Sequence, residues 1–301
     1  MSSALFDISK ALGAWRRTKS TTTRVPWPSY SIKKTAPHRD ALTSPLLNQP
    51  VLAINNLSLR LSHRQLLKNI NVELKAGQVS VLIGANGAGK SSLFKCIAGE
   101  HSYQGKLHLF GQERHAWCRQ ALARQLGVLP QQSSLQFPFL AKEVVSLGRI
   151  PHQASPSEHA KVIEYCMRQA QVWQLRDAPY PQLSGGEKQR IHFARVLAQL
   201  TGTQQPKLLL LDEPTSALDL GQQHSVLEEA RRLASQGCGV LVIIHDLNLA
   251  ARYGDQLLLL DKGELVSQGS AQQVLSTENV ARYFGYKAQL IQSPFGHPIL
   301  I

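Results

Sequence analysis

The chain has 301 residues, 43% of them hydrophobic, which is enough for one large domain or two small ones with a buried core. Its densest apolar runs are only as long as strands and do not approach the eighteen or so residues of a membrane-spanning helix, so other chains must cross any membrane at which it works. Four widely separated cysteines without a CxxC pair argue against a disulfide framework and a zinc site, and the formal net charge of +13 is compatible with nucleic acid or an anionic membrane surface.

Residues 1–50 are expected to form a basic, disordered extension. They contain eight Lys or Arg and two acidic residues, in a stretch rich in Ser, Thr and Pro that resists packing. Apolar residues at helical spacing, Leu5, Ile8, Leu12 and Trp15, also fit a short membrane-surface helix. An upstream start codon or a transit peptide would give a similar composition, so the role of this extension stays open.

From residue 51 onward, the patterns of strands and helices alternate. Segments 51–61 and 69–77 are predicted to pair as antiparallel strands. The run VSVLIG at 79–84 is predicted to be a strand that leads through a glycine-rich loop into a helix at 90–99. This order of elements indicates an α/β fold with an antiparallel β subdomain at its start.

Two later apolar runs, at 207–214 and 239–246, are continuous and are typical of parallel strands buried on both faces. Between the glycine loop and these strands lies a more helical insertion, at about 132–182. The sequence therefore predicts a P-loop core domain over 51–275, with a mostly parallel sheet and a helical subdomain. Residues 276–301 are expected to form a C-terminal segment packed on this domain.

The glycine-rich loop fits the pattern G-x-x-x-x-G-K-[ST] and lies between a predicted strand and a predicted helix, as phosphate-binding loops do. Its backbone N–H groups and the helix N-terminus would surround a β-phosphate, Lys90 would contact the β and γ oxygens, and the Ser91 hydroxyl would reach Mg²⁺. The alternative is a strand-to-helix turn without a ligand. The candidate nucleotide-binding residues are Gly84, Ala85, Asn86, Gly87, Ala88, Gly89, Lys90, Ser91 and Ser92.

Two acidic residues end the predicted strand LLLLDE. Asp212 would emerge at the carboxyl edge of the sheet, beside the phosphate loop, and is the candidate to hold Mg²⁺ through water. Glu213 is the candidate to orient and deprotonate an attacking water. An acid at a strand end is by itself more often a turn or helix cap, so both assignments depend on the loop upstream.

His245 and Gln131 also follow predicted strands. A lone histidine at such a place is usually structural, but His245 would lie on the same sheet edge as Gly84 and Asp212, where it could hydrogen-bond a γ-phosphate and hold the attacking water. Gln131 could bind Mg²⁺ or water through its amide. We interpret His245, Gln131 and Glu213 as the catalytic set, with Gln131 also a metal candidate beside Ser91 and Asp212.

The segment LSGGEKQR presents a second cradle for an anion. Ser184 and Glu187 have the spacing of a capping box, so a helix cap alone would explain them. Gly185 and Gly186 weaken a first helical turn and indicate a backbone that is approached closely by a ligand. Since one chain cannot easily bring this cradle to its own phosphate loop, a second copy facing it is the better candidate.

These motifs, in this order, resemble the ATP-binding subunits of ABC transporters, over roughly residues 52–270. The motifs that carry the resemblance are GANGAGKSS, Gln131, LSGGEKQR, LLLLDEP, SALD at 216–219, and His245. The resemblance implies ATP and Mg²⁺ as ligands and a head-to-tail dimer with two ATP molecules at its interface. Each ATP would lie between one subunit's phosphate loop and the other's Ser184 to Gly186, and Asp219 would join the two sites.

A narrower similarity is to the ATPases of bacterial hemin importers, within the group that serves iron chelates and vitamin B12. It rests on LPQQSSLQFPF, EVVSLGRIPH, LDEPTSALDLGQQHSVLEEAR and HDLNLAARYGDQLLLLDKGELVSQG. It implies a peripheral subunit on the cytoplasmic face of the bacterial inner membrane. Its partners would be a second copy of itself, two membrane permeases and a periplasmic hemin-binding protein, and no nucleic acid.

Two features depart from that family. The loop after the first strand lacks the usual aromatic residue that stacks on adenine, and His63 or Arg64 is the candidate to replace it. The resemblance also gives no role to residues 1–50. A ferric siderophore or B12 importer is the alternative cargo assignment. A soluble ABC ATPase acting on nucleic acid would carry a second nucleotide domain or a coiled-coil insert, and a P-loop kinase would leave LSGGEKQR and SALD without a purpose.

Overall fold

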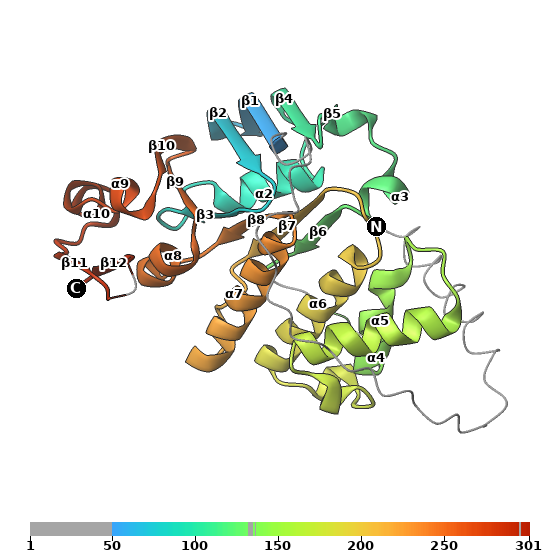
Figure 1. Ribbon diagram of the computed structural model, residues 1–301. Helices are drawn as coiled ribbons and strands as arrows, with labels where there is room; N and C mark the ends of the chain where they lie inside the picture. Colours follow the sequence, from blue (N-terminus) through green and yellow to red (C-terminus); the bar gives the residue numbers. More distant parts are fainter. Residues whose placement is uncertain (1–49, 132–134, 136, 295) are drawn as a thin grey trace, which may run out of the picture. The chain divides into compact units, whose positions relative to one another are not determined.

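The computed structural model describes residues 50–131, 135, 137–294 and 296–301 (Figure 1). These residues belong to one unit of the chain, residues 44–301. The extension predicted for residues 1–50 lies outside the described residues, apart from Pro50, where the first strand begins. No helix in the described part is both long and apolar enough to cross a membrane.

A six-stranded sheet forms the centre of this unit, in the order β10-β9-β3-β8-β7-β6. Its strands are β3 (Val79–Ile83), β6 (Leu126–Leu129), β7 (Lys207–Asp212), β8 (Cys238–Ile243), β9 (Gln256–Asp261) and β10 (Glu264–Gly269). The pairs β3–β8, β3–β9, β6–β7 and β7–β8 are parallel, and β9–β10 is antiparallel. Strand β8 is buried along its whole length and β7 from Leu208 to Asp212, so the prediction of parallel strands covered on both faces is confirmed.

A second, four-stranded antiparallel sheet has the order β2-β1-β4-β5. Its strands are β1 (Pro50–Leu61), β2 (Arg64–Lys75), β4 (Gln104–Leu109) and β5 (Gln112–Glu113). The predicted antiparallel pairing of β1 with β2 is confirmed. The two sheets and α2 (Lys90–Ala98) share a hydrophobic core, in which alternate residues of the central strands, such as Leu82 and Leu210, face β1 and β2.

The opposite face of the central sheet packs against helices, drawn below it in Figure 1. Residues such as Val81 and Leu211 point to this side. The helices on it and those elsewhere in the described part are α3 (Arg119–Leu122), α4 (Ala141–Ser146), α5 (Pro156–Gln169), α6 (Gly185–Leu200), α7 (Leu220–Ser235), α8 (Leu247–Tyr253), α9 (Ala271–Val274) and α10 (Thr277–Phe284). One-turn 3-10 helices are η2 (Arg114–Ala116), η3 (Leu147–Arg149), η4 (Trp173–Leu175) and η5 (Tyr180–Gln182).

The helical insertion contains α4 and α5. Helix α5 begins at a capping box in which the Ser155 hydroxyl accepts from the Glu158 N–H. It ends at Gln169, because Gln171 takes a left-handed conformation with φ 55° that an α-helix cannot continue. At the C-terminus, β11 (Leu290–Gln292) pairs with β12 (Pro298–Leu300), and Leu300 exchanges hydrogen bonds with the Asn248 side chain of α8.

Candidate functional site

Four neighbouring strands end at the same edge of the central sheet. Since β3, β8, β7 and β6 are consecutive and parallel, the residues that follow them emerge side by side. Gly84 follows β3, His245 follows β8, Asp212 and Glu213 end β7, and Gln131 follows β6. The topology alone therefore brings together the loop glycine, two carboxylates, an imidazole and an amide.

The glycine loop joins β3 to α2 in a conformation that needs glycine at its first position. Gly84 has φ 149°, and a Cβ there would lie 2.1 Å from the carbonyl oxygen of Leu260. Lys90 begins α2 and is buried, and its Nζ donates to the carbonyl oxygens of Gly84 at 2.8 Å and Ala85 at 3.0 Å. The ammonium group thus lies inside the curve of the loop, where phosphate oxygens would replace these carbonyls.

Burial lowers the pKa of Lys90, and the nearby carboxylates of Glu213 and Asp212 act in the opposite direction. The lysine lies between a desolvating loop and two negative charges. Such a cation gains from a polyanionic ligand that would supply further oxygens around it.

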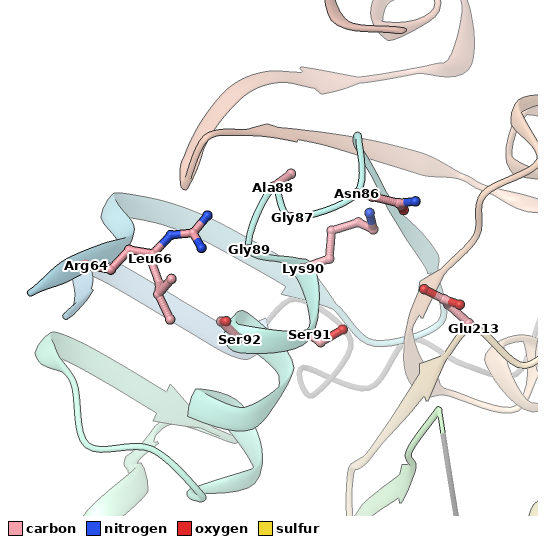
Figure 2. Close-up of a pocket in the computed structure, with 10 residues that line it drawn as sticks. All are labelled: Arg64, Leu66, Asn86, Gly87, Ala88, Gly89, Lys90, Ser91, Ser92 and Glu213. Carbon is pink, nitrogen blue, oxygen red and sulfur yellow. The ribbon is translucent and has the colours of Figure 1, made fainter. Parts of the chain in front are cut away.

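A cavity of about 230 Å³ opens in front of this loop. It is lined by Arg64, Leu66, Asn86, Gly87, Ala88, Gly89, Lys90, Ser91, Ser92 and Glu213. Figure 2 shows Arg64 and Leu66 at one end of the loop and Glu213 at the other. The cavity is therefore polarised, with a guanidinium and an aliphatic side chain opposite a carboxylate.

Asp212 is buried at the end of β7, and one of its oxygens, Oδ1, has no hydrogen-bond partner among the described residues. Burial raises the pKa of this carboxyl and the charge of Glu213 adds to the effect, while a hydrogen bond from Ser91 and the charge of Lys90 act against it. A buried carboxylate oxygen without a partner, beside a serine hydroxyl, fits a hard cation such as Mg²⁺. The described residues hold no cluster of three or more His, Cys, Asp or Glu, so other oxygens would have to complete such a site.

Glu213 is the centre of a hydrogen-bonded group at the far end of the cavity. Its Oε1 lies 2.5 Å from His245 Nε2, and its Oε2 accepts from Gln131 Nε2 at 2.7 Å. The three side chains come from three different strand ends and meet only in the fold. The arrangement places a carboxylate, able to accept a proton, between two groups able to orient a water or a phosphate oxygen.

The second cradle forms the start of α6. Ser184 is its N-cap: the hydroxyl accepts from Glu187 N at 3.3 Å and donates to Glu187 Oε2 at 2.8 Å, so the predicted capping box is present. Gly185 has open space where a Cβ would lie, whereas a Cβ on Gly186 would lie 2.9 Å from the Ala217 carbonyl oxygen. The exposed first turn thus presents free backbone N–H groups on a helix N-terminus.

These residues do not join the cavity within the chain. Ser184, Gly185, Gly186 and Asp219 are absent from the described residues that line it. Asp219 is the exposed N-cap of α7, where its Oδ1 accepts from Gln222 N at 2.8 Å. His63, a candidate for the adenine end, also does not line the cavity, whereas Arg64 does.

Two contacts were not anticipated from the sequence. Leu66 lines the cavity beside Arg64, and Gln189, from the segment LSGGEKQR, donates through Nε2 to the carbonyl oxygen of Glu213 at 3.1 Å. The Leu66 contact depends on how β2 passes the loop. The sequence gives only a weak indication of the Gln189 contact, namely that this residue lies one turn after the cradle on the same predicted helix.

The fold and this cavity define the class of P-loop ATPases, with a phosphate loop and an acidic strand end on one sheet edge. A family model described as ABC transporter matches residues 67–216. The hemin import ATP-binding protein HmuV of Plesiomonas shigelloides is 48% identical, covering 80% of this chain and 97% of the relative. The HmuV of Vibrio vulnificus strain YJ016 is 49% identical, covering 81% and 94%. The chain belongs to the ABC transporter family, as an ATP-binding subunit with ATPase activity.

Solved structures agree with this assignment. A metal-chelate type ABC transporter in an inward-facing conformation superposes with a TM-score of 0.69 at 28% identity, covering 84% of this chain and 96% of that one. A dimeric bacterial ABC transporter cassette superposes with a TM-score of 0.65 at 27% identity, covering 73% and 98%. The predicted α/β P-loop fold with an antiparallel β subdomain and a helical subdomain is therefore confirmed.

Proposed function

We propose that this chain hydrolyses ATP to drive the import of hemin through a membrane permease. The observation that carries the cargo is the identity of 48% to a hemin import ATP-binding protein, over nearly the whole of that relative. The cavity itself supports the reaction, because it combines a phosphate loop with a carboxylate held by two hydrogen-bonding side chains. The cargo does not need to touch this chain, so the site explains the energy source and the relatives indicate the transported molecule.

In the proposed reaction, residues 84–92 hold the triphosphate through backbone N–H groups, Lys90 and the serine hydroxyls. Glu213 accepts the proton of the attacking water, and His245 and Gln131 orient that water and the γ-phosphate. The distances of 2.5 and 2.7 Å from Glu213 to these two partners support a shared role.

Ser91, Asp212 and Gln131 would hold Mg²⁺ together with phosphate oxygens. The unpartnered Oδ1 of the buried Asp212 carboxylate supports this assignment. When bound, Mg²⁺ supplies positive charge to the phosphate oxygens as the γ-phosphate leaves. Asp212 must be ionised for that role, and a cation beside it offsets the burial that raises its pKa.

The opposite end of the cavity would receive the adenosine part of ATP. Since the phosphates lie between Lys90 and Glu213, the base must lie toward Arg64 and Leu66, at the end shown in Figure 2. A guanidinium can stack on a planar base and an aliphatic side chain can pack against it. This pair would replace the aromatic residue expected from the family.

We infer a head-to-tail homodimer in which Ser184 to Gly186 of one subunit face the ATP of the other, and Asp219 joins the two sites. The exposure of this first turn and its separation from the cavity support the arrangement. The full assembly would contain two permeases and a periplasmic hemin-binding protein, with this chain peripheral on the cytoplasmic face of the bacterial inner membrane. The domain division would be 1–50, 51–275 with a helical subdomain at about 132–182, and 276–301.

The cargo assignment is tested by purifying the chain with its permease in lipid vesicles and measuring ATP hydrolysis. We expect hemin, delivered by its binding protein, to raise the rate several-fold over the basal rate. A ferric siderophore and vitamin B12, each with its own binding protein, are the controls. Stimulation by either of these and not by hemin would contradict the proposal and favour the alternative cargo.

A further inference from the structure

The backbone of Glu213 has a conformation that residues other than glycine rarely adopt. Its φ is 51°, in the left-handed region, and the next residue is Pro214. A proline disfavours helical conformations of the residue before it. The backbone of Glu213 is therefore strained for two reasons, its positive φ and the proline that follows. Strain of this kind persists only where surrounding contacts hold the residue in place.

The contacts that hold it meet at the Glu213 carbonyl oxygen. Ser216, in the same turn, donates to it from Oγ at 3.1 Å and from its backbone N at 3.3 Å. The remaining donor is Gln189 Nε2, at 3.1 Å, which comes from α6. Gln189 is thus the side chain from outside the turn that fixes the orientation of this peptide group.

The same helix touches this turn at a second point. Gly186 packs so closely against the Ala217 carbonyl oxygen that an added Cβ would lie 2.9 Å from it. The first turn of α6 therefore lies against residues 213–217 through Gly186, and one turn later through Gln189. Both contacts belong to one continuous helix, which begins at the capping box of Ser184.

Among the described residues, the Gln189 side-chain amide makes one hydrogen bond, to the carbonyl oxygen of Glu213. Its Oε1 is buried and has no partner among the described residues. A side chain that leaves its own acceptor unpaired while its donor bonds a strained carbonyl is not explained by the stability of α6 alone.

We propose that Gln189 is a positioning residue for Glu213, which couples the cradle at the start of α6 to the catalytic carboxylate of the same chain. This inference rests on the proposed function. In the proposed dimer, the cradle contacts the ATP bound to the partner. A movement of α6 when that ATP binds would move the Gln189 amide. The peptide group that orients Glu213 would move with it. One ATP would thereby control the carboxylate that acts on the other.

The test replaces Gln189 by methionine, which has the same length and no donor, in the full-length chain assembled with its permease. Because residues 84–92 are untouched, we expect the Kd for ATP and the melting temperature to stay close to wild type. We expect kcat to fall by about 10- to 100-fold, because a small displacement of a catalytic group has effects of this order. If one ATP controls the carboxylate that acts on the other, the wild-type rate should depend sigmoidally on ATP concentration, and the Hill coefficient of the variant should fall to about 1.

Gln199→Met is the matched control. Gln199 lies on the same helix, and its Nε2 also donates to backbone carbonyl oxygens, those of Ala123 at 2.8 Å and Leu126 at 3.0 Å. We expect this variant to lose stability and to keep kcat. Gln189→Glu, which has the same shape and no donor when ionised, gives a second version of the test if the methionine variant does not fold.

A double variant tests the shared carbonyl directly. Ser216→Ala removes one of the other donors, so Gln189→Met with Ser216→Ala should lower kcat by more than the product of the two single effects. A normal kcat in both Gln189 variants, while Glu213→Gln is inactive, would overturn the role of Gln189 and leave the proposed function intact. Hydrolysis at the wild-type rate by Glu213→Gln would instead remove Glu213 as the base, and an absence of ATP hydrolysis by the wild-type assembly would contradict the proposed function itself.

Discussion

Glu213 combines a strained backbone with a side chain that is held at both oxygens. Its neighbours come from the ends of β6 and β8 and from α6, so three separate segments help to determine where one carboxylate points. The side chain is only 14% exposed, while that of His245 is 45% exposed and borders solvent. The imidazole is therefore the more solvent-accessible partner of this pair.

Replacing this carboxylate gives the first prediction at the residue scale. Glu213→Gln keeps the size of the side chain and leaves the glycine loop unchanged, so we expect ATP binding near the wild-type level. The rate of hydrolysis should fall by about 10²- to 10⁴-fold, because an amide cannot accept the proton of the attacking water. ATP turnover and equilibrium nucleotide binding measure the two effects, and an ATP-bound dimer should accumulate.

The exposed acid Glu278, in the first turn of α10, provides the control for the loss of one negative charge. Glu278→Gln should keep the wild-type rate. A Glu213→Gln chain that hydrolyses ATP normally would remove Glu213 as the base.

The strand-end residues of the site could be predicted from the sequence, and two other residues could not. Asp212, Glu213 and His245 follow continuous apolar runs, and parallel strands end at one edge, so their proximity follows from the pattern. The contacts of Leu66 and Gln189 depend instead on how β2 and α6 pack against the central sheet. A sequence pattern fixes which face of an element is buried, and it does not fix which carbonyl a side chain on that element reaches.

At the scale of elements, the helical insertion is joined to α6 by a very close approach. A Cβ on Gly148 of η3 would lie 2.1 Å from the carbonyl oxygen of Arg195 in α6. The buried Arg149 side chain lies beside it and donates from NH1 to the carbonyl oxygens of Ala198 and Thr201, each at 2.6 Å. The insertion is thus attached to the helix that carries the cradle.

The close contact between Gly148 and the Arg195 carbonyl oxygen gives a prediction about stability. Gly148→Ala should lower the free energy of unfolding by about 1–3 kcal/mol, because the added methyl group overpacks a backbone contact. The measurement is chemical denaturation. Gly221→Ala in α7 is the matched control: its Cβ would meet Asp219 Oδ1 at an ordinary 3.7 Å, so the same substitution should raise stability by about 0.4–1 kcal/mol. Equal effects of the two substitutions would contradict the packing argument.

The types of the long elements were predictable, and their ends were less so. The apolar runs predicted β3, β7 and β8 correctly, and the helical insertion predicted at about 132–182 contains the long helix α5. That helix stops at Gln169, because Gln171 is left-handed and Trp173 begins a 3-10 turn. Trp173 is apolar and continues the helical spacing, so the periodicity carries no signal of the break.

At the scale of the whole molecule, the two half-sites proposed for this chain do not meet within it. The cavity in front of the glycine loop is lined by Glu213 at one end, and Ser184, Gly185 and Gly186 of the cradle are not among its described lining residues. The dimeric cassette that superposes on this chain indicates how such half-sites are brought together in a relative. The sequence predicted both halves, since each has its own motif, but a single chain contains no information on the distance between two copies.

Mixed dimers test the arrangement. Ser184→Arg blocks the cradle, and Lys90→Ala removes the cation of the loop, so neither variant alone should form an ATP-dependent dimer. In a mixture, each heterodimer retains one complete site, formed by the intact loop of one chain and the intact cradle of the other. We expect ATP-dependent pairing to return in the mixture, as measured by size-exclusion chromatography or light scattering.

Each single variant is the control for the mixture. If the cradle instead served the loop of its own chain, every subunit in the mixture would carry a broken site. The absence of pairing in the mixture, with both variants folded, would therefore contradict the exchange of half-sites between subunits.

The hydrogen bonds of Lys90 to its own loop have a consequence for the end of each cycle. An ammonium group buried in a protein needs acceptors for its N–H groups whether or not a phosphate is bound. Here the carbonyl oxygens of Gly84 and Ala85 receive it at 2.8 and 3.0 Å. When the phosphates leave at the end of a cycle, these carbonyl oxygens and the charges of Glu213 and Asp212 remain around the ammonium group, so we expect Lys90 to keep its place in the loop.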